Sequence, residues 1–322
     1  MSDLYLGLDG GGTKTAALLM DGDGNILGRG EGGPGNIIHT PDNILKRSVM
    51  DSVKQACANA SVESESCHFN RVCAAMAGYS DELRRDSFLG ILHNTLNSKA
   101  IRVEPDYVAA FWGATHGSPG IVVVAGTGAI AYGRNDQGKS WREDGLGFLL
   151  GDRGSGFNLG LRTLRHTLEK MQEGKLDRLS EAVIEHTGAE SQNHILQWLY
   201  SDFQPAKVAT LAPVVGQLAD SGDEAACYHL AVMARRLRHS VRQVRHNLWL
   251  SRESPVYTLG GLWKVSRFLV SEFTEPCWQP SSGLQIEPDP LPAGSFHIAD
   301  PLSEPVYGAA FLALNQECAN IA

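Results

Sequence analysis

The chain has 322 residues, more than the roughly 250–300 residues at which a single hydrophobic core stops growing, so two domains are expected. Hydrophobic residues make up 43% and charged residues 20%, which is the composition of an ordinary globular protein and excludes extensive disorder. The formal net charge of -8, with scattered basic residues, disfavours nucleic acid and membrane surfaces as partners, so a small molecule is the default partner.

The beginning of the chain and its cysteines predict a cytoplasmic protein. The chain opens on a charged, glycine-punctuated strand instead of the basic stretch and apolar helix of a signal peptide. Its longest apolar runs are much shorter than the roughly 18 residues that a membrane span needs. The six cysteines form no CxxC pair and have no histidines at zinc-finger spacing, so we expect reduced, mostly buried thiols.

The first third of the chain alternates predicted strands and helices. Short apolar runs between Gly, Asn and Asp residues predict strands, and apolar residues at helical spacing predict helices. The predicted strands are 4–9, 15–21, 26–30, 71–77 and 101–103, and the predicted helices are 43–60, 81–97 and 107–115. This alternation predicts an α/β layer.

The strand pattern then restarts, with strands predicted at 121–125, 129–134 and 139–143. Both copies have the order strand, glycine-rich turn, strand, polar turn, strand, which indicates a duplicated domain. The Gly/Pro-rich segment 116–120 is the expected boundary. We therefore expect domains of 1–116 and 117–303, with the C-terminal helix, within 304–322, packing back on the first.

Beyond residue 156 the chain is predicted to be mostly helical. The predicted helices are 157–171, 176–186, 193–200, 207–218, 224–250, 263–273 and 304–316. A strand is predicted at 256–259, where two glycines follow it. The Pro/Gly-rich segment 277–301 is expected to be a loop with a short strand at 284–287.

A glycine-rich turn follows the first strand, whose end carries the acidic residue Asp9. Three glycines, ending in Gly11 and Gly12, leave the backbone bare, so its amides could approach phosphate oxygens closely. The turn is not a Walker A loop, because Thr13 separates Gly12 from Lys14 and a strand comes next. A solvent-facing hairpin is the alternative, but three consecutive glycines cost more backbone entropy than a turn requires.

A second glycine turn occupies the matching position of the second copy. Gly126, Thr127 and Gly128, followed by Ala131, imitate a GxGxxA dinucleotide fingerprint, but that fingerprint must open a helix and here a strand is predicted. The motif alone is weak. Together with the first turn, it predicts two hairpins that grip one phosphate chain.

Two aspartates stand where predicted helices begin. Asp106 ends a strand just before a helix, at the rim where ligands bind in open α/β sheets. A carboxylate there could orient an attacking hydroxyl and accept its proton, although an aspartate at this place could equally be a helix N-cap. Asp152 has the same two interpretations, and the glycines on both sides of it favour ligand contact.

These motifs together resemble the sugar kinase, Hsp70 and actin superfamily, and within it the branch of N-acetylglucosamine and glucosamine kinases in the BadF/BadG/BcrA/BcrD ATPase family. Residues 9–15 resemble the first phosphate motif, 126–128 the second, 257–261 the adenosine motif and 145–156 the sugar-side signature. The resemblance implies two ribonuclease H-like, actin-like ATPase domains with a cleft between them. It also implies transfer of the γ-phosphoryl group of ATP to the 6-hydroxyl of an amino sugar.

The resemblance further implies a role for each motif residue. Asp9 would hold magnesium through water and Asp106 would be the catalytic base. The implied nucleotide-binding residues are Gly11, Gly12, Thr13, Lys14, Gly126, Thr127, Gly128, Gly260 and Gly261, and the implied sugar-binding residues are Asn36, Asp106, Gly145 and Asp152. A homodimer is expected from the family alone. Leu146 replaces the usual tryptophan of the signature and Arg153 a frequent glutamate, so the preferred amino sugar stays open.

Two other functions remain as alternatives. An ATPase activator of a radical dehydratase or reductase would hold an iron–sulfur cluster at a dimer interface, but none of Cys57, Cys67 and Cys73 sits in a glycine-rich loop. A non-catalytic sugar sensor would keep the site residues and show no turnover. No DNA-binding helix pair is apparent in the sequence.

Overall fold

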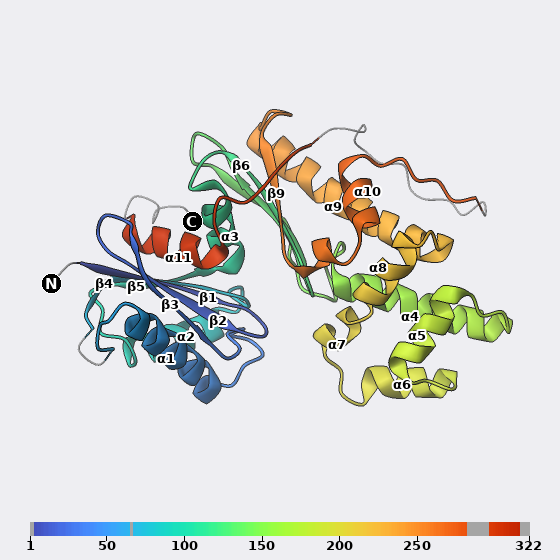
Figure 1. The fold of residues 1–322 in the computed structure, drawn as a ribbon, viewed down its shortest axis with the longest axis horizontal. Coiled ribbons are helices and arrows are strands. Elements are labelled where there is room, and N and C mark those ends of the chain that lie inside the picture. Colours follow the sequence, from blue (N-terminus) through green and yellow to red (C-terminus); the bar gives the residue numbers. More distant parts are fainter. Residues whose placement is uncertain (1–2, 65–66, 282–295, 316–322) are drawn as a thin grey trace. The chain divides into compact units, whose positions relative to one another are not determined.

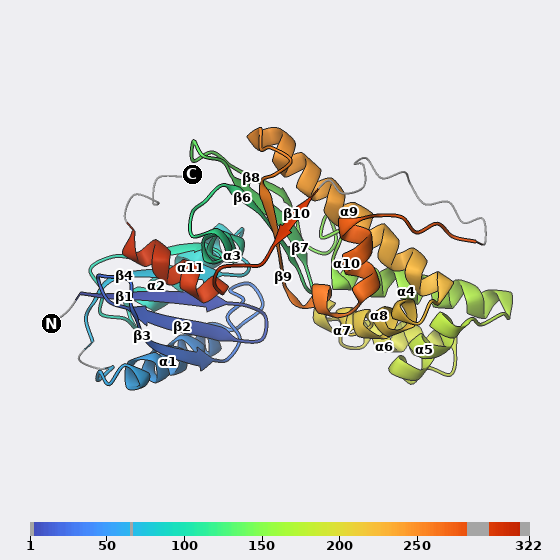
Figure 2. The same ribbon diagram turned by 45° about the horizontal axis from the view of Figure 1, so that its top comes forward.

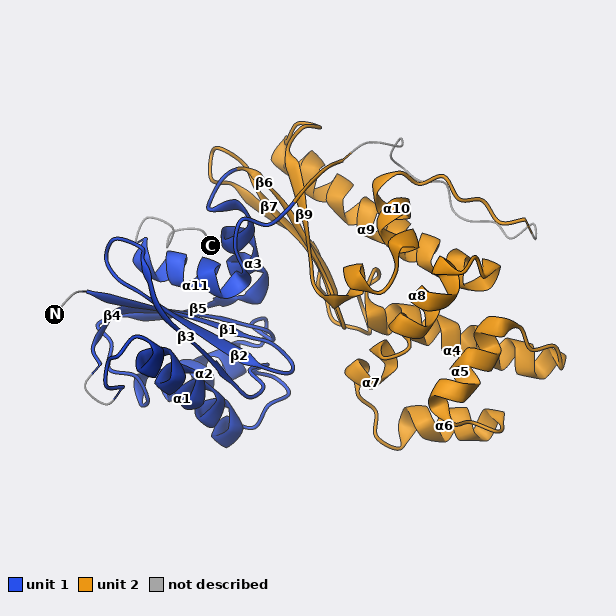
Figure 3. Cartoon of the chain, viewed as in Figure 1, with its two compact units in different colours: residues 1–118, 300–322 blue, residues 119–299 orange. Residues whose placement is uncertain are grey.

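The computed structural model describes residues 3–64, 67–281 and 296–315. The chain divides into two compact units, Met1–Ser118 with Asp300–Ala322, and Pro119–Ala299 (Figure 3). Each unit contains one mixed five-stranded sheet and its own helices (Figure 1). The first unit is divided from the second between Ser118 and Pro119, and the second unit runs to Ala299.

The sheet of the first unit has the strand order β3-β2-β1-β4-β5. Its strands are β1 (Leu4–Gly10), β2 (Thr15–Met20), β3 (Ile26–Gly32), β4 (Phe69–Met76) and β5 (Ile101–Pro105). The first three strands pair antiparallel through hairpins, and β1, β4 and β5 run parallel. In parallel pairs the carboxyl ends of the strands meet at one edge, so β1 and β5 both deliver their last residues there.

Helices cover both faces of this sheet (Figure 1). The helices of the first unit are α1 (Asp42–Asn59), α2 (Glu82–His93), α3 (Asp106–Thr115) and α11 (Pro305–Leu314). Leu6 and Leu8 of β1 pack with α1 and α2 in the main core, whereas Ala75 of β4 packs with α3 and α11 on the opposite face. The last described helix therefore belongs to the first unit. Residues 316–322 of the predicted C-terminal segment lie outside the described residues.

Alternate glycines of β3 allow α1 to lie directly on the strand. A Cβ atom built on each would come within 2.0 Å of a carbonyl oxygen of α1, which no real side chain permits. The pairs are Gly28 with Ala56, Gly30 with Ser52, and Gly32 with Ser48. Because side chains alternate along a strand and residues four apart share a helix face, these three contacts form one continuous seam.

The sheet of the second unit repeats the first. Its strands are β6 (Gly120–Ala125), β7 (Ala129–Arg134), β8 (Ser140–Asp144), β9 (Pro255–Leu259) and β10 (His297–Ala299). Taken from the β8 edge, the order is β8-β7-β6-β9-β10, with the same parallel and antiparallel pairs as β3-β2-β1-β4-β5. The predicted α/β fold with a duplicated domain is confirmed.

The second unit carries most of the helices. They are α4 (Gly156–Glu173), α5 (Arg178–Thr187), α6 (Gln192–Tyr200), α7 (Pro205–Ala209), α8 (Ala212–Asp220), α9 (Glu224–Leu248), the 3₁₀ turn η1 (Gly261–Lys264) and α10 (Arg267–Thr274). The long α9 lies along β6, β7 and β8 (Figure 2). Gly133 of β7 leaves room there for Val244. None of the helices in the described ranges has the length and apolar character needed to cross a membrane.

Three secondary-structure predictions need correction. The single helix predicted over 207–218 is two helices, α7 and α8, because Pro213 lacks the N–H that would continue one helix and stands in the first turn of a new one. The helix predicted over 263–273 begins as a 3₁₀ turn, and α10 starts only after Ser266, whose hydroxyl accepts the N–H of Leu269. Strand β10 was not predicted, and the strand predicted at 284–287 lies outside the described residues.

Candidate functional site

The β1–β2 turn of the first unit presents backbone N–H groups to solvent. The N–H of Gly11 donates to the carbonyl oxygen of Lys14 at 2.9 Å, which closes the hairpin. The N–H groups of Gly12 and Thr13, both exposed residues, donate to no residue that the structure describes. A Cβ atom on Gly12 would meet nothing within 4 Å, so the space above the turn is open. Two adjacent free N–H groups of this kind attract an anion.

Two carboxylates lie near each other beside this turn. Asp9 is the penultimate residue of β1, and Asp106 is the first residue of α3, directly after β5. Burial, and next the negative charge of Asp106, raise the pKa of Asp9 to about 7, while Lys14 opposes the shift. Burial also raises the pKa of Asp106. The first unit therefore concentrates negative charge at the carboxyl ends of its strands.

The N-cap alternative for Asp106 does not describe its position. Pro105 is the N-cap of α3 and no side chain caps that helix. The Oδ1 atom of Asp106 instead accepts the N–H of Tyr107, its immediate neighbour, at 2.9 Å. The backbone N–H of Asp106 itself also donates to this carboxylate, so two neighbouring N–H groups at the start of α3 hold it in place.

Asn36 is connected to the same turn through its neighbour, because the N–H of Gly35 donates to the carbonyl oxygen of Gly11 at 2.8 Å. The Oδ1 atom of Asn36 accepts the N–H groups of Ile38 and His39 at 3.0 and 3.2 Å. Its Nδ2 group donates to no residue within the described ranges. Asn36 therefore offers a hydrogen-bond donor whose orientation its own loop fixes.

Arg84 of α2 holds the loop that follows Asn36, and sequence reasoning did not identify it. Its guanidinium donates to the carbonyl oxygens of Ile37 and Thr40 at 2.8 and 3.0 Å and to the carboxylate of Asp42 at 2.7 Å. The planar guanidinium thus fixes three groups at once. No sequence motif marks this residue, since its partners lie more than 40 positions away.

Lys14 forms an ion pair with Glu31 at the surface. Its Nζ atom lies 2.7 Å from the Oε1 atom of Glu31, and both side chains are more than 60% exposed. Such a pair contributes little stability, so Lys14 could exchange Glu31 for a phosphate at small cost. Its nucleotide-binding role stays a prediction.

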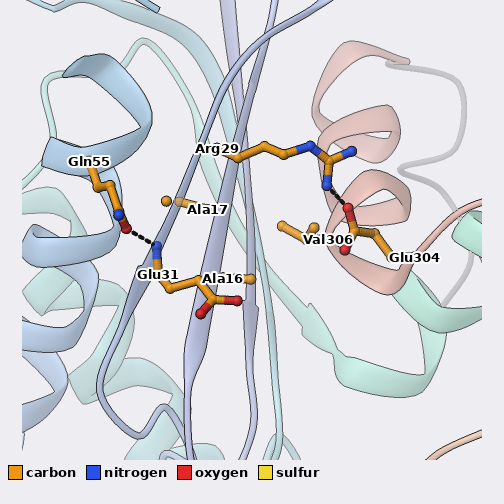
Figure 4. A pocket seen from close by; sticks show the side chains of 8 residues that line it. Ala16, Ala17, Arg29, Glu31, Gln55, Glu304 and Val306 are labelled. Carbon is orange, nitrogen blue, oxygen red and sulfur yellow. Dashed lines mark hydrogen bonds and ion pairs between the residues drawn. The ribbon is translucent and has the colours of Figure 1, made fainter. Parts of the chain in front are cut away.

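A surface pocket of the first unit lies along the edge strand β3 (Figure 4). None of the predicted site residues lines it. On one side Gln55 of α1 accepts the N–H of Glu31 at 2.6 Å, and on the other Arg29 forms an ion pair with Glu304, next to the start of α11. These contacts hold the edge strand β3 between two helices and cover part of its exposed backbone.

The β6–β7 turn of the second unit repeats the arrangement of the first. The N–H of Gly126 donates to the carbonyl oxygen of Gly128 at 2.8 Å, while the N–H groups of Thr127 and Gly128 donate to no described residue. The carbonyl oxygens of Gly126 and Thr127 accept the N–H groups of Gly156 and Phe157, in the first turn of α4. The turn is thus attached to the positive end of an 18-residue helix, which favours an anion further.

Asp152 lies against this turn. A Cβ atom on Gly128 would be only 3.0 Å from the Oδ2 atom of Asp152. Asp152 belongs to the connection from β8 to α4, in which Gly145 also lies, and its φ of +53° is in the left-handed region. Its N–H donates to the Oδ1 atom of Asp144 at 2.6 Å. Asp144 was not among the predicted site residues, although it stands directly before the glycine-rich signature.

Gly260 brings the predicted adenosine motif to the same place. It follows β9, which pairs with β6, and a Cβ atom on it would be 2.3 Å from the carbonyl oxygen of Ala125, the last residue of β6. Gly261, in contrast, has open space around its Cα. The second unit therefore collects residues 126–128, 145, 152, 260 and 261 around the ends of β6 and β9.

The possible metal ligands among the described residues, which are the His, Cys, Asp and Glu side chains, form no three-residue cluster. Cys57, Cys67, Cys73 and Cys227 are buried and free, Cys277 is exposed, and Cys318 lies outside the described residues. This placement does not favour the iron–sulfur alternative.

The chain is similar to several known proteins over most of its length. The chain is 27% identical to the N-acetyl-D-glucosamine kinase of Dictyostelium discoideum over 98% of this chain and 99% of the relative. It is 28% identical to the N-acetylmuramic acid/N-acetylglucosamine kinase of Clostridium acetobutylicum over 83% and 88%. A solved structure from Chromobacterium violaceum, provisionally named an N-acetylglucosamine kinase, shares the fold with a TM-score of 0.77 at 24% identity over 98% and 99%. The profile of one family matches residues 6–290, and the chain belongs to the BadF/BadG/BcrA/BcrD ATPase family.

Proposed function

We propose that this chain is an ATP-dependent kinase that phosphorylates the 6-hydroxyl of N-acetylglucosamine or glucosamine. The observation that carries the proposal is Asp106, a carboxylate with a raised pKa whose Oδ1 atom is held by the N–H of Tyr107, near Asp9 and the glycine turn of its unit. The activities named for the relatives from Dictyostelium and Clostridium support an amino sugar as the acceptor.

The phosphates of ATP are the proposed ligands of the glycine turns. Each turn offers two N–H groups without a partner in the described structure, and the second turn adds the N-terminus of α4. Thr13 and Thr127 supply hydroxyl groups at the same positions. Gly260 and Gly261, beside the second turn, are the proposed contacts of the nucleoside.

Magnesium fits the charge that the first unit concentrates. Repulsion between Asp106 and Asp9 contributes to the raised pKa of Asp9, and a divalent cation would offset that repulsion. The family resemblance implies that Asp9 would hold this ion through water. When bound, the ion neutralises charge on the transferred phosphoryl group.

Asp106 is the proposed base. Burial raises its pKa, which makes the carboxylate a stronger acceptor for the proton of the attacking hydroxyl. The N–H of Tyr107 holds Oδ1, which fixes the orientation of the carboxylate that would receive the proton. Because most of the work in phosphoryl transfer is positioning, this fixed orientation matters as much as basicity.

Asn36 and Asp152 are the proposed contacts of the sugar hydroxyls. A hydroxyl both donates and accepts hydrogen bonds, and these residues supply one donor amide and one acceptor carboxylate. The donor of Asn36 is the Nδ2 group, since its own loop occupies Oδ1.

A coupled ADP-release assay tests the function. ATP, magnesium and one sugar at a time would be supplied, from a panel of N-acetylglucosamine, glucosamine, N-acetylmuramic acid and glucose. We expect sugar-dependent ADP release with an amino sugar and little release without sugar. If no sugar of the panel raised ADP release above the sugar-free rate while ATP still bound, the kinase assignment would fail and a sensor would be the better description.

A further inference from the structure

The connection between β8 and α4 is closed by one carboxylate. The Oδ1 atom of Asp144 accepts the N–H of Asp152 at 2.6 Å, and its Oδ2 atom accepts the N–H of Arg153 at 2.9 Å. Residues 145–151, named the signature loop here, lie between these anchor points. Inside the loop the N–H of Gly151 donates to the carbonyl oxygen of Gly147 at 2.8 Å. The two ends of the signature loop are thus joined through the hydrogen bonds that Asp144 accepts.

The backbone at both ends of the signature loop is in a conformation that side chains rarely adopt. Asp144 has a φ of +67° and Asp152 a φ of +53°. Non-glycine residues occupy this left-handed region only when surrounding contacts hold them there. The missing side chain of Gly151 leaves space for the carboxylate of Asp144, because a Cβ atom on Gly151 would be 2.4 Å from the Oδ1 atom of Asp144. The two hydrogen bonds to Asp144 are among the contacts that hold Asp152 in place, and the carbonyl oxygen of Asp152 also accepts the N–H of Ser155 at 3.0 Å.

The position of the Asp152 carboxylate depends on the hydrogen bonds to Asp144. Asp152 lies four residues before the start of α4, and its Oδ2 atom lies beside Gly128 of the β6–β7 turn. The carboxylate is joined to the backbone through a single methylene group, so a change in the backbone dihedral angles of Asp152 would move it. If the N–H groups of Asp152 and Arg153 were released, the residue could relax and turn its carboxylate away from the turn.

We propose that Asp144 is a positioning residue that sets the affinity for the sugar by fixing Asp152. The inference rests on the proposed function, in which Asp152 contacts a sugar hydroxyl. A carboxylate is required, because each of its oxygens accepts one N–H. An asparagine has a single acceptor oxygen, and its NH2 group would face the N–H of the other residue, donor against donor.

The test compares Asp144→Asn and Asp144→Gly with the wild type. We expect the KM for the amino sugar to rise at least tenfold in both variants and the KM for ATP to stay within twofold. Glycine adopts a positive φ without strain, so Asp144→Gly keeps the test valid if the asparagine variant folds poorly.

Asp220→Asn is the matched control. The Asp220 carboxylate also accepts two consecutive N–H groups, those of Arg267 and Phe268, at 3.2 and 3.0 Å, in the same unit. This variant loses the same kind of hydrogen bond at the start of α10, and we expect its KM for the sugar to match the wild type. A sugar KM within twofold of the wild type in both Asp144 variants, or an equal rise in Asp220→Asn, would overturn the proposal.

Hydrogen exchange separates this inference from the function. In protein without ligands, the amides of residues 152 and 153 should exchange faster in Asp144→Asn than in the wild type, and equal exchange would overturn the role of Asp144 in holding them. A wild-type protein that phosphorylates no sugar would overturn the proposed function and the sugar-positioning role with it. An active wild type with unchanged Asp144 variants would overturn this inference alone.

Discussion

Gly260 lies so close to Ala125 that a single added methyl group at Gly260 would stand 2.3 Å from the carbonyl oxygen of Ala125. Its φ of +102° is also one that residues with a Cβ atom rarely adopt. We therefore expect Gly260→Ala to lower the free energy of unfolding by about 2 kcal/mol or more, measured by chemical denaturation. Gly261→Ala, next to it in open space, should unfold like the wild type. Equal stability of the two variants would contradict the packing described.

A substitution in the second glycine turn should affect ligand binding instead of stability, because Gly126 has neither a positive φ nor a close neighbour. Gly126→Ala should fold normally but weaken ATP binding, since its methyl group would occupy space above the N–H groups of the turn. Calorimetric titration of ATP into the variant measures the loss. Gly90→Ala, within α2, is the matched control, because Gly90 also has neither a positive φ nor a close neighbour. An unaltered ATP affinity in Gly126→Ala would argue against phosphate at this turn.

The seam between β3 and α1 can be tested at its centre. A Cβ atom in Gly30→Ala would meet the carbonyl oxygen of Ser52, and α1 would have to move, at a cost of roughly 1–3 kcal/mol or more. Gly90→Ala is a useful control, because Gly90 lies within α2 with nothing near its Cα. That substitution should stabilise the helix by up to about 1 kcal/mol. Thermal unfolding of both variants would show opposite changes.

The proposed base has a neighbouring carboxylate to compare with it. Asp106→Asn keeps the shape of the residue but cannot accept the proton, so we expect kcat to fall by about 10²–10⁴-fold with the KM for ATP little changed. Glu104, two residues earlier in β5, also has a pKa raised by burial, and Glu104→Gln should retain most activity. An Asp106→Asn enzyme as active as Glu104→Gln would refute the role of Asp106.

His229 predicts a pH dependence of stability in the second unit. Burial first, then the charges of Arg162 and His166, lower its pKa from 6.5 to about 3, and neither ring nitrogen has a hydrogen-bond partner in the described structure. Between pH 6.5 and pH 3, His229 is protonated in the unfolded chain but stays neutral in the folded chain. Stability should therefore fall as the pH decreases from about 6.5 towards 3, by at most about 1.4 kcal/mol per pH unit from this residue.

His229→Phe removes that contribution. Denaturant titrations at pH 7.5 and pH 5 should show a smaller difference for the variant than for the wild type. His297→Gln, at an exposed position of β10, should keep the wild-type difference. A wild-type pH dependence in His229→Phe would exclude His229 as its source.

The loop that carries Asn36 depends on a residue outside every motif. Arg84→Lys keeps the charge but loses the planar fork that holds Ile37, Thr40 and Asp42, so we expect a several-fold higher KM for the sugar with a similar KM for ATP. Arg47→Lys, at an exposed position of α1, is the control. A sugar KM unaffected by Arg84→Lys would show that the loop holds Asn36 without it.

Local patterns in the sequence predicted most of the fold, because alternation, helical periodicity and glycine punctuation are local properties. The repeat was visible for the same reason, since both copies place a glycine turn after a buried strand. The break between α7 and α8 was missed because the apolar period continues across it and only Pro213 marks the new start. Strand β10 has three residues, too few for any period to appear.

The residues that support the site were harder to predict than those in it. Asp9, Asp106 and Asp152 stand beside glycines or at strand ends, where a polar residue is conspicuous. Asp144 and Arg84 act through hydrogen bonds to backbone groups, and their effect depends on the folded path of a loop. The spacing of residues in the sequence does not indicate the path of a loop, so the roles of Asp144 and Arg84 can be recognised only in the folded structure.

The two sheets share their connectivity but not their charge. Asp9 pairs with Ala16 across the hairpin one step before the strand end, and in the second copy the matching step pairs Val124 with Ile130. An aliphatic side chain thus stands where its counterpart is acidic. Backbone N–H groups without a partner in the described structure are therefore common to the two glycine turns, whereas only the first turn has an acidic side chain at this step, and the doubled architecture is asymmetric at the level of single side chains.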